Sequence, residues 1–275
     1  MDSRYIDERG ESPAHIDRRN RGCPAVDDGA TIHWTSSGSG RQTLILVHGW
    51  TCDESSWKEQ VPALSKSYRI VTLDLPGHGK SGMPKAFSME LFARAIEAVR
   101  AEAKIDRALL VGHSMGTPVI RKYALMYPER VAGLVIVDGL VQLSANAVQP
   151  GQPGRGPLPA VTLQTREAMV KGMFGPATTP ALQEHILKMM MGAPEATAAG
   201  AMAATWDTSQ LSDQKITVPV LAVFAGTRAL ATEQAVKTLY PNAEYHTIPE
   251  TAHFLMMEKP IEFNRMLLKF VEQFK

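Results

Sequence analysis

Short runs of apolar residues recur along the chain, separated by segments in which apolar and polar residues follow a helical period. Each run has the length and composition of a buried strand. The runs are residues 30–35, 43–47, 68–74, 108–111, 133–138, 218–224 and 243–248. The segments between them favour helices at 54–65, after the N-cap residue Ser88, and at 115–126, 232–239 and 260–274. This alternation predicts an α/β fold with a mostly parallel, doubly wound sheet covered by helices on both faces.

The alternation stops between the runs at 133–138 and 218–224. The interval holds a Gly- and Pro-rich stretch, 150–157, and then Ala- and Met-rich helical segments at 166–174 and 181–191. We interpret it as a helical cap inserted into the core. The predicted organisation is a mobile tail at 1–25, an α/β core at 26–139 and 214–275, and the cap at 140–213.

Methionines are frequent in the predicted cap, and Met169 and Met173 are two of them. The unbranched thioether suits an adaptable apolar pocket, so we expect these two side chains to contact a substrate. Packing of the cap against the sheet is an equally good explanation for either one.

The charges are balanced, because 29 Lys and Arg residues stand against 28 Asp and Glu residues, for a formal net charge of +1. A balanced surface has no electrostatic footprint for nucleic acid or an anionic membrane. No apolar run reaches the roughly 18 residues of a membrane-spanning helix. We therefore expect a small neutral or apolar molecule as partner, and neither nucleic acid nor a membrane. The oligomeric state stays open.

Cys23 and Cys52 are the only cysteines, and neither has the neighbours of a metal site. Two such thiols suit a reducing compartment better than a disulfide. Residues 1–22 are densely charged and lack the apolar core of a signal peptide. We expect a cytoplasmic protein without a metal centre.

The strongest chemical motif is Gly112-His113-Ser114-Met115-Gly116, which lies between a predicted strand and a predicted helix. Its glycines allow a turn too tight for a side chain with a Cβ, which leaves Ser114 on the tip. A serine hydroxyl needs a base to remove its proton and donors to stabilise an oxyanion. The backbone N–H of Met115, near a helix N-terminus, is suited to be one such donor.

Further motifs follow the predicted strands in a set order. His48-Gly49 follows the run at 43–47, Asp74-x-Pro-Gly-His-Gly-x-Ser81 ends the run at 68–74, and His253 follows the last run. With the Ser114 turn, this order resembles the α/β-hydrolase superfamily over residues 30–275, specifically its cap-bearing serine esterase-like branch. The resemblance implies an α/β-hydrolase fold with a helical cap inserted after the sixth strand of the family.

The resemblance also implies roles for individual residues. Ser114 would be the nucleophile, and His253 the general base and then the general acid. The backbone N–H groups of Trp50 and Met115 would form the oxyanion hole. Residues expected near the substrate are His48, Trp50, His113, Met169 and Met173. The Trp50 indole lines the acyl pocket or packs under the cap, and His48 and His78 brace loops near the site.

The acid of the triad departs from the usual family pattern. The usual position follows the run at 218–224, but Gly226-Thr227-Arg228-Ala229 stands there, and Ala229 cannot orient an imidazole. The known alternative follows the preceding strand, where Asp138 stands. We predict Asp138 as the acid; Asp53, Glu250 or no acid at all remain alternatives.

These roles predict a serine hydrolase that cleaves a small or medium carboxylic ester through an acyl-enzyme, without a cofactor. Lactone, thioester, amide and C–C bond hydrolysis would use the same triad. The absence of a carboxylate at position 229 motivates a second reading, a ligand-binding protein on a hydrolase scaffold. A third reading is a cofactor-free lyase or oxygenase that uses His253 as a base.

Overall fold

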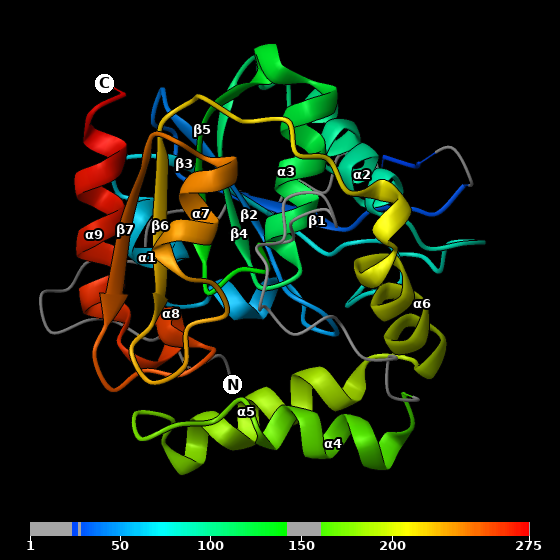
Figure 1. Cartoon of the computed structure of the whole chain (residues 1–275). Coiled ribbons are helices and arrows are strands. Elements are labelled where there is room, and N and C mark those ends of the chain that lie inside the picture. Colours follow the sequence, from blue (N-terminus) through cyan, green and yellow to red (C-terminus); the bar gives the residue numbers. More distant parts are fainter. Residues whose placement is uncertain (1–23, 27–28, 142–160, 275) are drawn as a thin grey trace, which may run out of the picture.

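The computed structural model describes residues 24–26, 29–141 and 161–274. At its centre is a 7-stranded sheet in the order β1-β3-β2-β4-β5-β6-β7 (Figure 1). Its strands are β1 Trp34–Ser37, β2 Thr43–Val47, β3 Arg69–Leu73, β4 Ala108–His113, β5 Val131–Val137, β6 Val220–Ala225 and β7 Ala243–Ile248. All neighbours pair in parallel except β1, which is antiparallel to β3. The predicted mostly parallel sheet is confirmed.

Helices cover both faces of this sheet (Figure 1). They are α1 Val61–Leu64, α2 Met89–Glu102, α3 Gly116–Met126, α4 Leu163–Lys171, α5 Pro180–Gly192, α6 Glu195–Trp206, α7 Glu233–Leu239, α8 Leu255–Glu258 and α9 Pro260–Glu272. Helices α2 and α3 pack against each other on one face, and α1 and α9 lie on the other (Figure 1). Ser88 caps α2 as predicted, since its side chain accepts a hydrogen bond from the Leu91 N–H at 3.0 Å.

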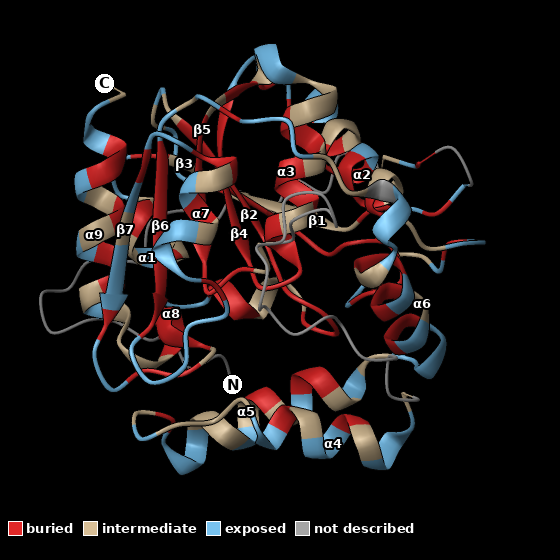
Figure 2. Cartoon of the chain, in the orientation of Figure 1, coloured by how far each residue is buried: buried red, intermediate tan, exposed pale blue. Residues whose placement is uncertain are grey.

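The centre of the sheet forms the core of the molecule. Every residue of β2, β4 and β6 is buried, as expected for strands covered on both sides (Figure 2). At the edge, β7 is exposed along much of its length. The rigid central strands therefore carry the loops that emerge at their carboxyl ends.

Three segments differ from the sequence-based expectation. The predicted strand at 30–35 is displaced along the chain to β1, because Ser36 and Ser37 pair with Val71 and Ile70 of β3. The predicted helix at 54–65 divides into the 3-10 turn Glu54–Trp57 and α1, which carries a proline in its first turn. The Ala-rich segment of α6 showed too little amphipathic period to be recognised as a helix.

Helices α4, α5 and α6 lie between β5 and β6 in the sequence, where a cap was predicted. In Figure 1, α4 and α5 lie beyond the carboxyl ends of the strands, toward which the arrow of β7 points. Of the predicted tail, only residues 24 and 25 are described, and the stretch at 150–157 lies outside the described residues.

Candidate active site

Ser114 stands on a tight turn between β4 and α3, as its sequence motif predicts. Its backbone is in the left-handed region, with φ of 53°, a conformation that costs energy in a non-glycine residue. The turn depends on Gly116, because a Cβ at this position would come within 2.4 Å of the Val47 carbonyl oxygen of β2. Ser114 itself is 9% exposed. The turn thus fixes a nearly buried hydroxyl at the carboxyl edge of the central strands.

Asp138 directly follows β5 and reaches the imidazole of His253. The distance from His253 Nδ1 to Asp138 Oδ2 is 2.7 Å, and the Asp138 side chain is almost completely buried. Asp138 is a second non-glycine residue with positive φ, at 36°. A carboxylate in this position fixes the orientation of an imidazole and leaves its Nε2 to face outward.

The loop after β6 holds the other oxygen of the same carboxylate. Asp138 Oδ1 accepts hydrogen bonds from the backbone N–H groups of Ala225, at 3.2 Å, and Leu230, at 3.3 Å. Ala229 therefore lies in a loop that contributes backbone donors in place of a carboxylate. Because backbone donors require no particular side chain, the sequence carries no signal for this role.

The other two candidate acids have different partners. Asp53 Oδ1 accepts the Ser55 N–H at 2.8 Å and so caps the turn Glu54–Trp57. Glu250 is exposed and pairs with Lys259 at 2.9 Å. Of the three predicted candidates, Asp138 is the one that bonds to His253.

The loop that carries His253 is held through its backbone as well. The fully buried His113 bonds through Nε2 to the His253 carbonyl oxygen at 2.9 Å. A carbonyl only accepts, so Nε2 carries the proton of a neutral imidazole. Burial and the nearby His253 keep the pKa of His113 well below its ordinary value, which agrees with this form. His113 was predicted to contact substrate; in the structure its ring supports the His253 loop.

Two backbone donors near Ser114 have no acceptor among the residues that the structure describes. Within the described residues, neither the Trp50 N–H nor the Met115 N–H makes a hydrogen bond. The turn that holds Trp50 touches Ser114, since a Cβ on Gly49 would lie 3.1 Å from the Ser114 Cβ. Unpaired N–H groups beside a hydroxyl at a helix N-terminus can stabilise a developing negative charge.

Ser114 Oγ and His253 are not yet joined. Among the residues that the structure describes, no hydrogen bond links the Ser114 hydroxyl to the imidazole. Contacts of this kind are often long in a ligand-free site and tighten when a substrate is bound.

The Trp50 indole packs against α6. Its Nε1 donates to the Ala198 carbonyl of α6 at 2.8 Å, and the residue is 6% exposed. Met169 of α4 and Met173 are partly buried against the core cluster. Met173 also accepts, through its carbonyl, the His253 N–H at 3.4 Å. Substrate contact by these side chains stays a prediction.

His48 and His78 are fully buried and join the loops after β2 and β3. His48 Nε2 accepts the Leu75 N–H at 2.9 Å, and the His78 ring donates through Nδ1 to the Pro76 carbonyl at 3.0 Å. Burial lowers the pKa of His48, and burial together with His48 lowers the pKa of His78 to about 3. Both rings therefore brace these loops, and the fully buried His48 has no exposed surface through which to contact a substrate.

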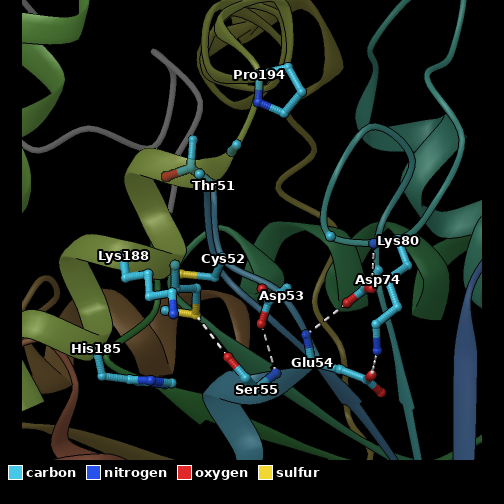
Figure 3. A pocket seen from close by; sticks show the side chains of 14 residues that line it. Thr51, Cys52, Asp53, Glu54, Ser55, Asp74, Lys80, His185, Lys188 and Pro194 are labelled. Carbon is cyan, nitrogen blue, oxygen red and sulfur yellow. Dashed lines mark hydrogen bonds and ion pairs between the residues drawn. The ribbon is translucent and has the colours of Figure 1, made fainter.

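A cavity of about 530 Å³ lies beside the site, between α5 and the loops after β2 and β3 (Figure 3). Its walls include Thr51, Asp53 and Lys80 from the core and His185 and Lys188 from α5. Ser114 is not part of its lining. Asp138 and His253 are not among its lining residues either.

His33, Glu54 and Asp74 bring possible metal-ligating atoms within 4.8 Å of one another near this cavity. Lys80 Nζ already lies 2.8 Å from Glu54 Oε1. Asp74 accepts the backbone N–H groups of Glu54, at 2.7 Å, and Lys80, at 2.8 Å. This donor set is satisfied by internal bonds and by a lysine ammonium, so it does not fit a metal ion.

Within the described ranges, no helix is long and apolar enough to cross a membrane.

Comparison with known proteins places this geometry in a family. A family model described as alpha/beta hydrolase fold matches residues 42–164. A pimeloyl-(acyl-carrier protein) methyl ester esterase of Vibrio cholerae serotype O1 is 30% identical over 258 residues, which cover 87% of this chain and 97% of that protein. The enzyme of the same name from Edwardsiella ictaluri is 36% identical over 122 residues, and this match spans about half of each protein, 44% of this chain and 46% of the relative.

Other relatives carry different names on the same fold. A 2-hydroxy-6-oxononadienedioate/2-hydroxy-6-oxononatrienedioate hydrolase of Paraburkholderia phymatum is 29% identical, with coverage of 88% of this chain and 91% of that one. The solved structure of a thermophilic esterase from Thermogutta terrifontis superposes with a TM-score of 0.78 at 23% identity, over 91% of this chain and 97% of the other. With its sheet order, its serine turn and these relatives, the chain belongs to the α/β-hydrolase family.

Proposed function

We propose that this enzyme is a serine hydrolase that cleaves a small or medium carboxylic ester through an acyl-enzyme. The observation that carries the proposal is the 2.7 Å contact between His253 Nδ1 and the buried Asp138 carboxylate. It orients the imidazole at the sheet edge where Ser114 stands, as the base of a triad must be oriented. Relatives named as methyl ester esterases support an ester as substrate.

Each residue has one part in the proposed reaction. His253 takes the proton of the Ser114 hydroxyl as Ser114 attacks the ester carbonyl, and Asp138 stabilises the imidazolium that forms. The N–H groups of Trp50 and Met115 hold the oxyanion. His253 then gives its proton to the leaving alcohol. Water activated by His253 releases the acid from Ser114 in the second half of the reaction.

Helices α4, α5 and α6 are, in this proposal, the cap that encloses the substrate. Trp50 supports this assignment, because its indole joins the loop after β2 to α6 at 2.8 Å. The substrate is a small molecule whose acyl or alcohol part lies between these helices and the sheet edge.

The main competitor is a ligand-binding protein on a hydrolase scaffold. This alternative was motivated by the absence of a carboxylate at position 229. The contact between Asp138 and His253 weighs against it. A cofactor-free lyase or oxygenase would use His253 as a base without an acyl-enzyme. Both alternatives predict that Ser114 forms no covalent intermediate.

The experiment that tests the proposal is covalent. We expect a burst of p-nitrophenol from p-nitrophenyl acetate, and labelling by a fluorophosphonate that maps to Ser114 by mass spectrometry. S114A should lose both signals while its thermal unfolding stays close to that of the wild type. If folded wild-type protein shows neither burst nor label, the enzyme is not a serine hydrolase.

A further inference from the structure

Glu258, at the end of α8, lies between the loop that carries His253 and the cap region, by which we mean the segment from α4 to α6. Its carboxylate has a separate partner on each oxygen. Oε2 accepts the backbone N–H of Ala252, the residue before His253, at 2.6 Å. Oε1 accepts the hydroxyl of Thr178, just before α5, at 2.6 Å. One side chain thus joins two segments that are far apart in the sequence.

The direction of the Thr178 bond is fixed by a third group. Thr178 Oγ1 accepts the Gly175 N–H at 2.8 Å, so its proton is free to point at Glu258. Burial raises the pKa of Glu258, whereas the bonds from Thr178 and Ala252 favour the ionised form. Both bonds have the short lengths of charge-assisted hydrogen bonds.

The two segments touch at further points. Gly175 lies so close to the His253 loop that a Cβ on it would come within 2.6 Å of the Ala252 Cβ. The His253 N–H also donates to the Met173 carbonyl at 3.4 Å. Residues 173–178 of the cap region therefore run along the backbone of Ala252 and His253, and Glu258 is the side chain that locks them together.

We propose that Glu258 is a positioning residue that couples the cap region to the general base. This inference rests on the proposed function. It states that residues 173–178 cannot shift without also shifting His253 relative to Ser114. A base displaced by about 1 Å can cost roughly 100-fold in rate. The missing bond between Ser114 and His253 leaves room for such an adjustment when substrate fills the cap.

The test compares four variants by steady-state kinetics on p-nitrophenyl acetate. E258A should lower kcat by about 10- to 100-fold with KM nearly unchanged, because the base is displaced and the substrate contacts remain. E258Q, which can still accept from Ala252, should recover most of kcat. T178V should lose several-fold in kcat, and T178S, which keeps the hydroxyl, should restore it.

The matched control is E250A, which removes an exposed carboxylate from the loop that carries His253 and should leave kcat unchanged. Thermal unfolding gives the folded fraction of each variant, so that kcat can be expressed per folded molecule. A positioning role predicts that T178V and T178S still differ in this corrected kcat. Wild-type protein that labels at Ser114 while E258A and T178V keep wild-type kcat would overturn this inference alone. Wild-type protein that fails to label would instead overturn the proposed function.

Discussion

The loops after β5 and β6 stand side by side at the carboxyl edge of the sheet, but they contribute different chemical groups. The loop after β5 supplies the buried carboxylate of Asp138. The end of β6 and the loop after it, where the family usually carries its acid, supply the N–H groups of Ala225 and Leu230 to that carboxylate. In the proposed triad, the acid therefore follows β5, and the segment where the family usually carries it supplies hydrogen bonds to that acid.

The largest expected effect comes from removing the charge after β5. D138N should lower kcat by about 10⁴. The amide would favour the wrong tautomer of His253 and would not stabilise the imidazolium that forms during the reaction. Hydrolysis of p-nitrophenyl acetate measures the loss, and circular dichroism reports whether the fold is kept. D53N and E250Q are the controls, since both side chains have other partners. A near-normal rate for D138N would refute the proposed acid.

A second change moves the carboxylate back to the loop after β6. In the D138N background, A229D should recover about one to two of the four lost orders of magnitude, because position 229 adjoins the Leu230 N–H that marks the acid's place. Recovery of kcat in the double variant measures how far the two loops are interchangeable. No gain at all would mean that a carboxylate at position 229 does not orient the His253 imidazole.

We expect the stability of the protein in acid to depend on the buried histidines around the site. Burial lowers the pKa of His48, His78 and His113, so the unfolded chain binds more protons than the folded one as pH falls below about 6.5. Stability must therefore fall with acid in this window. Asp74 and Glu258, whose pKa burial raises, act in the opposite sense at lower pH. The melting temperature should drop by roughly 5 °C or more between pH 7 and pH 5.

Two histidine variants sharpen this expectation. H78Q removes a group with a pKa of about 3 in the folded chain and should flatten the pH dependence of the melting temperature. H246Q changes a half-exposed histidine and should leave it as steep as in the wild type. Equal slopes for both variants would contradict the role given to His78.

The smallest expected effect concerns the anchor of the loop after β6. Thr227 Oγ1 donates to the Thr251 carbonyl at 2.8 Å, so T227V should lower the free energy of unfolding by about 1 kcal/mol. Urea unfolding measures this loss, and kcat should change little because the donors to Asp138 remain. T238V, which removes a hydroxyl bonded within α7, is the control. A large loss of kcat in T227V would show that the loop needs this anchor to hold the acid.

Much of the fold followed from local patterns in the sequence. The central strands are short apolar runs, and Ser114 stands on a turn whose glycines and flanking elements are adjacent in sequence. These features depend on periodicity and chain order, both of which are present in the residues themselves. The role predicted for Asp138 came instead from the resemblance to the family, whose known alternative acid follows the same strand.

The supports of His253 could not be predicted in the same way. The link from Thr178 through Glu258 to Ala252 joins two segments that only folding brings together. His113 was expected near the substrate, and its bond to the His253 carbonyl oxygen could not be foreseen from the sequence. Bonds to backbone groups leave no residue pattern on the acceptor or donor side, so the sequence is silent about them.

The bond between the Trp50 indole and α6 makes that tryptophan an optical reporter. Its ring is buried at the loop after β2, and its single polar atom is bonded to the Ala198 carbonyl. Any movement of α6 away from this loop breaks the bond and admits water, which shifts the emission of Trp50 to longer wavelength. Trp50 is one of four tryptophans in the chain, so a variant that keeps it alone would report how tightly α6 is seated, at the residue whose N–H would donate to the oxyanion.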